Sequence, residues 1–172
     1  MKLLNPDPKN WSNEDLEWLS FYANSRILGL GEVIHTSDGF YSSKVRLIKY
    51  LIAFHDFRAV AFESPWGRAL SVTECVRGNG TDPLSSLFGL FRVWRSQSVY
   101  QLIRFMVEWN TKNPEDPVRF FGIDTQQPEW DLKCLLSFSQ ISKKDKTLLI
   151  RLFKEMFGES IFRDQYYSSS DF

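Results

Sequence analysis

Apolar side chains recur at helical spacing in several separate stretches of the chain. At the first of them, Ser12 is suited to cap a helix, and Glu14 and Asp15 follow in the first turn, where the helix dipole favours negative charge. The later stretches carry apolar residues three and four positions apart, which is typical of helices with one buried face. The pattern predicts helices near residues 12–22, 40–54, 67–76, 84–91, 98–109, 129–138 and 143–157.

Three short apolar runs, at residues 26–31, 58–63 and 118–123, lie between these helices and are typical of buried strands. Because strands and helices alternate, we expect a parallel sheet with helices on both faces. The predicted fold class is α/β, layered as α/β/α with a short parallel sheet. One domain would span residues 1–160, and residues 161–172 would form a loose tail.

A parallel sheet is normally buried on both faces, and three strands make a thin one. The pattern therefore indicates a domain that is incomplete at the carboxyl terminus of the chain, or one that pairs with something else.

The net charge, the cysteines and the lack of long apolar runs exclude several classes of protein. The 172 residues carry 21 basic and 21 acidic side chains, so the formal net charge is +0, which gives no bulk attraction to nucleic acid or to an anionic membrane. The two cysteines, Cys75 and Cys134, stand far apart and fit a reducing compartment. Since no long apolar run marks a signal or a membrane span, we expect a cytoplasmic protein.

Ionisable residues follow each of the three predicted strands. Glu32 and His35 come after the first, Glu63 ends the second and Asp124 ends the third. Ligands of open α/β sheets bind at the carboxyl edge of parallel strands. A histidine is suited to act there as a general base near neutral pH, and a carboxylate three residues earlier is suited to orient it.

Each of these residues also has an ordinary structural interpretation. His35 can be a loop residue hydrogen-bonded to the backbone, and Glu63 and Asp124 can cap the helices that follow them. The spacing Glu-x-x-His is not the zinc motif His-Glu-x-x-His, and no dinucleotide, P-loop or nucleophile-elbow motif is present. His55 falls at the end of a predicted helix, where it suits the helix dipole. We predict no cofactor and no metal site.

Several segments, taken together, resemble the erythromycin esterase family. Gly31, Glu32 and His35 resemble its Gly-Glu-x-x-His signature, and the segments that match further family motifs are Lys44–Leu51, Ala59–Glu63, Trp66–Ala69, Val76–Gly78, Trp94–Val99 and Phe121–Asp124. The resemblance covers residues 26–130. Lys44 stands where the family usually has arginine, and the second histidine region of the longer family members has no counterpart after Asp124.

The resemblance implies metal-independent hydrolysis of an ester, with macrolide lactones as the best-known substrates. His35 would take a proton from water, and Glu32 would position His35 or the water. The supporting and substrate-binding residues implied by the same match are Lys44, Trp66, Arg77 and Trp94, together with Glu63 and Asp124. A small-molecule ester is the expected partner.

Two other functions remain open at this point. The chain could be a catalytically silent remnant that binds a partner or a small molecule, with self-association through an unsatisfied sheet edge. A haem or metal binder is the third possibility, although the predicted cleft holds a single histidine.

Overall fold

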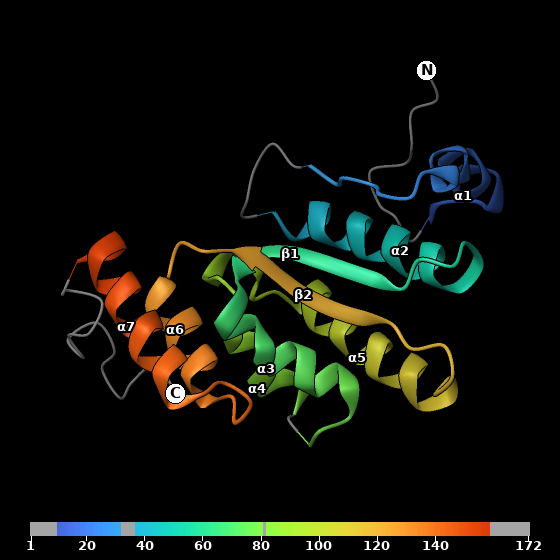
Figure 1. The fold of residues 1–172 in the computed structure, drawn as a ribbon. Helices are drawn as coiled ribbons and strands as arrows, with labels where there is room; N and C mark the ends of the chain where they lie inside the picture. Colours follow the sequence, from blue (N-terminus) through green and yellow to red (C-terminus); the bar gives the residue numbers. More distant parts are fainter. Residues whose placement is uncertain (1–9, 32–36, 81, 159–172) are drawn as a thin grey trace.

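Two parallel strands form the centre of the computed structural model, which describes residues 10–31, 37–80 and 82–158 (Figure 1). The helical elements precede, connect and follow the strands. In chain order the elements are α1 (Asn13–Ser20), η2 (Phe21–Asn24), α2 (Asp38–Phe54), β1 (Ala59–Pro65), α3 (Trp66–Arg77), α4 (Pro83–Ser86), η3 (Leu87–Gly89), η4 (Arg92–Trp94), α5 (Gln97–Lys112), β2 (Arg119–Asp124), α6 (Pro128–Ser137) and α7 (Lys143–Phe157).

The α/β fold class is confirmed. β1 and β2 pair in parallel, with Ala59 opposite Arg119 and Phe62 opposite Gly122, and the connection between them runs through α3, α4 and α5. The strands predicted at residues 58–63 and 118–123 lie within two residues of β1 and β2, and the helix predicted at 143–157 matches α7, whereas the helix predicted at 84–91 is the short helix α4 followed by the 3-10 turn η3. The expected loose tail, residues 161–172, lies outside the described residues.

The expected strand at residues 26–31 is wrong. This segment carries no strand pairing; Leu28 and Leu30 instead pack beside Leu47 and Leu51 of α2, while Ile27 is 88% exposed. The two leucines find apolar partners on α2, and the glycines between and after them offer no side chain that would pack against a neighbouring strand.

Local signals at helix ends agree with the sequence. The backbone N–H of Asp15 donates to Ser12 Oγ at 3.2 Å, and the N–H of Ser12 donates back to Asp15 Oδ2 at 2.7 Å, which forms a capping box. His55 is the C-cap of α2, as predicted. Gly78 ends α3 with φ +85°, a conformation that glycine adopts without a Cβ clash.

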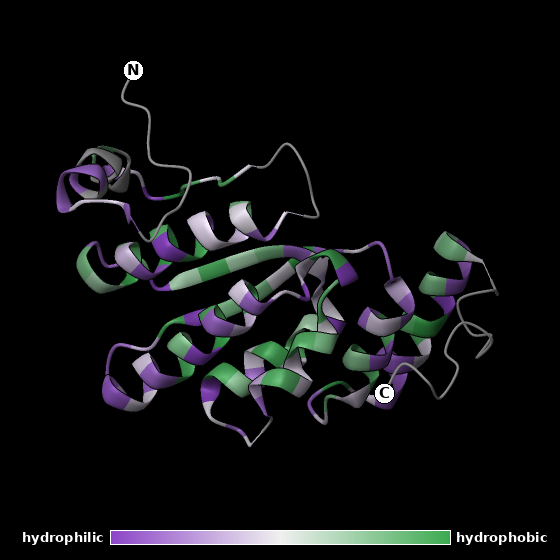
Figure 2. Ribbon diagram, turned by 180° about the vertical axis from the view of Figure 1, so that it is seen from behind, coloured by the Kyte–Doolittle hydropathy of each residue, from purple (hydrophilic) through white to green (hydrophobic). Residues whose placement is uncertain are grey.

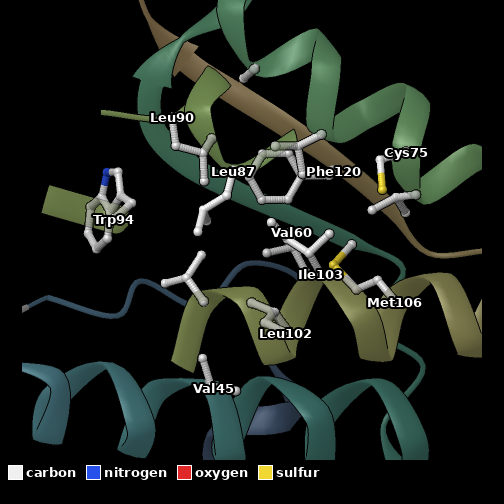
Figure 3. Packing of buried hydrophobic residues seen from close by; sticks show 14 of the residues in the cluster. Val45, Val60, Cys75, Leu87, Leu90, Trp94, Leu102, Ile103, Met106 and Phe120 are labelled. Atoms are coloured by element: carbon white, nitrogen blue, oxygen red, sulfur yellow. The ribbon is translucent and has the colours of Figure 1, made fainter. Parts of the chain in front are cut away.

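The hydrophobic core lies on one face of the sheet, between the strands and helices α2, α3 and α5 (Figure 3). Val60 and Phe120 point into it from the strands, and Phe120 is fully buried. Helix α5 supplies Leu102, Ile103 and Met106, all of which are also fully buried. In Figure 2, which shows the ribbon from behind, hydrophobic residues (green) occur along the strands and on the helices near them.

The opposite face of the sheet is exposed among the described residues. Its side chains, which alternate with those of the core, are Ala59, Ala61, Glu63, Arg119, Phe121 and Ile123. Ile123 is 68% exposed. We call these six residues the open face. The described helices that build the hydrophobic core pack on the other face.

No helix in the described ranges is long and apolar enough to cross a membrane.

Candidate functional site

A cavity of about 380 Å³ lies beside β1, on the side away from β2. One wall is the segment with Leu28, Leu30 and Gly31, another is α2, and the third is the length of β1 from Ala59 to Glu63. Most of its lining is apolar. A volume of this size suits a small organic molecule.

Three predicted site residues meet at this cavity: Lys44, Glu63 and Trp94. They come from α2, from β1 and from η4. The indole Nε1–H of Trp94 donates to the backbone oxygen of Glu63 at 2.7 Å, which ties η4 to the strand. Lys44 Nζ lies 5.7 Å from the centre of the Trp94 ring, within the range of a cation–π contact. Sequence motifs that are 50 residues apart are thus adjacent in the fold.

Aromatic packing holds the Trp94 ring in place. Its centroid is 5.3 Å from that of Tyr41 and 5.0 Å from that of Phe62, and the Phe62 contact has edge-to-face geometry. Such pairs fix ring orientation because the positive edge of one ring faces the negative face of the other. The cavity therefore has a rigid aromatic wall, an ammonium group and a carboxylate-bearing residue.

Glu32 and His35, the predicted catalytic pair, lie outside the described residues. The described residues on either side of them belong to segments that line the cavity. Gly31 lines the cavity, and Ser37 is the N-cap of α2, whose Tyr41 and Lys44 also line the cavity.

Asp124 ends β2 but does not line this cavity. Its Oδ1 accepts from the backbone N–H groups of Thr125 at 2.6 Å and Gln126 at 3.0 Å, so this oxygen caps the turn that leads to α6. Its Oδ2 is buried, with no hydrogen-bond partner among the described residues. The capping interpretation therefore accounts for one of the two carboxylate oxygens.

Asp131, which sequence reasoning did not single out, is a buried carboxylate near Asp124. It accepts from the backbone N–H of Gly67, at 2.7 Å, and so joins the start of α3 to α6. Burial raises the pKa of Asp131; the Gly67 hydrogen bond opposes this, and the charges of Glu129 and Asp124 add to it. Glu129 and Asp131 follow Pro128, and acidic residues at this position are typical of the first turn of a helix. The sequence does not show that Asp131 is buried, because its burial comes from the contact with α3.

Trp66 and Arg77 are not brought to the cavity. Trp66 begins α3, and its ring centroid lies 6.4 Å from that of Phe138. Arg77 is at the opposite end of α3 from Trp66, which at 1.5 Å per residue is about 17 Å away. There it forms an exposed ion pair with Glu74 at 2.9 Å.

Metal-ligating side chains do not gather anywhere in the described part of the chain: no three His, Cys, Asp or Glu residues stand close enough to hold an ion.

More than half of the chain matches a known protein family. The family model for erythromycin esterase matches residues 52–150, which include β1, α3, α5, β2 and α6. The chain therefore belongs to the erythromycin esterase family. The matched range starts after the segment that carries Glu32 and His35.

Individual relatives agree with this assignment. The Bacillus subtilis protein named "Putative hydrolase YbfO" is 32% identical over 122 residues, which are 70% of this chain and 26% of that protein. A solved succinoglycan biosynthesis protein superposes with a TM-score of 0.68 at 24% identity, over 89% of this chain and 39% of that one. A solved Bacillus cereus protein gives a TM-score of 0.62 at 25% identity, over 91% and 38%. This chain thus spans well under half the length of each.

Proposed function

We propose that the chain provides the amino-terminal part of a carboxylic ester hydrolase, with the cavity beside β1 as its substrate site. Membership of the erythromycin esterase family and a relative named as a hydrolase support this class of activity. Macrolide lactones are the first esters to test, because the family is named for them.

The observation that carries the proposal is the position of Gly31. This residue lines the cavity, and the next residues of the described chain that line it are Tyr41 and Lys44. In the sequence, Glu32 and His35 come between these cavity-lining residues. A general base must act within hydrogen-bond reach of the water that it activates, and this position in the sequence supports the proposed role of His35.

In the proposed reaction, neutral His35 takes a proton from water while the water oxygen attacks the ester carbonyl. Glu32 orients the imidazole. The tetrahedral intermediate carries a negative oxygen, which the Lys44 ammonium stabilises. When the carbon–oxygen bond to the alcohol breaks, the proton held by His35 passes to the departing alkoxide, and the products are a carboxylic acid and an alcohol. Trp94 and the apolar walls hold the substrate body.

The experiment measures hydrolysis of a macrolide lactone and of a panel of chromogenic aryl esters. We expect His35→Ala to lower kcat/KM by about 10²–10⁴-fold, which is the usual contribution of a general base. His55→Ala is the matched control, because His55 caps α2 outside this cavity and its loss should leave turnover unchanged. Full activity in His35→Ala, with folding verified by circular dichroism, would reject the mechanism.

A catalytically silent binding module is the second candidate. It is favoured by the short span of the chain, which covers 39% of the solved succinoglycan biosynthesis protein. In that case the ester panel shows no turnover with the wild-type chain, yet macrolides still quench the fluorescence of Trp94 when they bind. Replacing Trp94 with Phe and repeating the titration identifies the quenched residue.

A further inference from the structure

The charged side chains that line the cavity beside β1 lie at one of its ends. Residues 55–58 join the end of α2 directly to the start of β1, so the two elements run in opposite directions along the cavity. Lys44, in the first half of α2, therefore lies at the same end as Glu63, near the end of β1, and Trp94 contacts both residues. Phe57 lines the opposite end, and the described lining between the two ends carries no further charge.

The cavity is long and narrow. It follows β1 from Ala59 to Glu63, which at about 3.3 Å per residue is about 13 Å. A volume of about 380 Å³ over that length corresponds to a mean cross-section of about 30 Å². A space of this shape has room for one extended chain and is too narrow for a broad ring.

We propose that this cavity binds the acyl chain of a medium-chain fatty acid ester, with the ester group between Lys44 and Glu63 and the tail directed toward Phe57. An extended hydrocarbon chain advances about 1.3 Å per carbon, so about ten carbons fill a length of about 13 Å. Each methylene that leaves water for the apolar walls lowers the free energy of binding, whereas the polar ester group lies at the end that offers polar partners.

The inference rests on the proposed function for its chemistry and adds the class of substrate. Water adds to the acyl carbon, the bond from this carbon to the alcohol oxygen breaks, and a fatty acid and an alcohol leave. The new content is that the acyl side of the ester lies along β1, so the length of this side determines how well a substrate fits.

Nitrophenyl esters of straight-chain acids, from acetate to hexadecanoate, provide the test. With the wild-type chain, kcat/KM should rise by up to about fourfold for each added CH₂, the factor that corresponds to the burial of one methylene. It should reach its maximum near decanoate and fall for longer acids, because their tails exceed the length of the cavity.

Two alanines of β1 allow the cavity to be shortened at different depths. Ala61 and Ala59 both line it, and both are exposed enough to accept a larger side chain. Ala61 is about 7 Å along the strand from Glu63, so Ala61→Leu should reduce the preferred acyl length to about five carbons. Ala59→Leu narrows only the far end and should shorten the preferred length less. Ala53→Leu is the matched control, because Ala53 is exposed on α2 and does not line the cavity.

Calorimetric titration with sodium decanoate separates this inference from the proposed reaction. If the esters are hydrolysed with no dependence on acyl length, or if Ala61→Leu leaves the preferred length unchanged while circular dichroism shows it folded, the inference is overturned and hydrolysis stands. If no ester is hydrolysed, the proposed reaction fails and the Kd of decanoate decides. Binding that Ala61→Leu weakens by about tenfold or more, and Ala53→Leu does not weaken, supports the acyl site. Absent binding, or equal binding by Ala61→Leu, overturns it.

Discussion

Phe120 and Phe121 are consecutive residues of one strand, with the same side chain and opposite surroundings. Phe120 is fully buried against α3 and α5, whereas Phe121 is 38% exposed on the open face. Alternation along a strand places the two rings on opposite faces of the sheet, but it does not say which face is covered. Here the covered face is the one on which α2, α3 and α5 pack. The comparison shows that the buried apolar packing of the described residues is concentrated on one side of the sheet, whereas the other side is partly apolar and also carries Glu63 and Arg119.

The largest effect on stability, and the largest contrast between two variants, is expected when each of these rings is truncated to alanine. Phe120→Ala should lower the free energy of unfolding by about 3–5 kcal/mol, because it leaves a cavity in the core. Phe121→Ala should cost less than about 1 kcal/mol, since its ring is partly solvated already. Denaturant unfolding of the two variants measures the difference. Similar losses for both would show that the open face is covered in the free chain.

Gly122, the next residue, gives the second prediction. A Cβ there would lie 2.6 Å from the backbone oxygen of Ser64 and 2.7 Å from the Cβ of Ala69, on the covered face. Gly122→Ala should therefore destabilise the fold by about 1–3 kcal/mol through overpacking. At Gly29 an added Cβ meets nothing within 4 Å, so Gly29→Ala is the matched control and should leave the unfolding midpoint unchanged or slightly raised. A harmless Gly122→Ala would contradict close packing of α3 on β2.

The third prediction concerns the buried carboxylate that links α3 and α6. Burial holds the pKa of Asp131 above its ordinary value of 3.8, so the folded chain keeps a proton that the unfolded chain releases. The contribution of Asp131 to stability is therefore greatest in acid and declines as the pH rises through its raised pKa. Asn has an amide oxygen that can still accept from Gly67, and it never ionises. Relative to wild type, Asp131→Asn should gain thermal stability from about pH 3 to about pH 7. A difference that is independent of pH would refute this account.

The smallest effect is expected at the amino end of the strands, where Arg58 forms an exposed ion pair. Its Nε and Nη2 donate to the two carboxylate oxygens of Asp116, each at 2.6 Å. The Arg58 hydrogen bond lowers the pKa of Asp116 below 3.8, so its stabilising effect is present above that pH and is lost as the pH falls through the lowered pKa. Asp116→Asn should produce a small loss in thermal midpoint that disappears at high salt. A loss that persists at high salt would indicate a larger structural role for this pair.

The elements themselves followed from local signals. Apolar periodicity located α2, α5 and α7, and the strands β1 and β2 were predicted within one or two residues. Ser12 and His55 were recognised as cap positions because capping depends on neighbours in sequence. The expected strand at residues 26–31 failed for the opposite reason. Pairing with β1 depends on a distant segment, and Leu28 and Leu30 pack against α2 instead.

The candidate site was only partly predictable. Lys44 and Trp94 were chosen from family motifs and Glu63 also from its place at a strand end, and all three line one cavity. The same motifs also suggested Arg77, which lies at the far end of α3. A motif specifies which types of residue occur at which spacing. The orientation of helix α3 decides whether its first or its last residues lie near the cavity. Asp131 was missed because nothing in its neighbourhood in sequence distinguishes a buried first-turn acid from a solvated one.

Sequence by itself located most of the helices and the strands β1 and β2, since these depend on short-range patterns, and the alternation of strands and helices and the family motifs indicated parallel pairing and the family. Only the tertiary structure decided that Glu63 and Trp94 share a wall of one cavity, that Asp131 is buried against α3 and that one side of the sheet is left exposed. Those facts depend on packing between segments tens of residues apart, where the free energy of burial is decided by the partner surface and not by the residue alone.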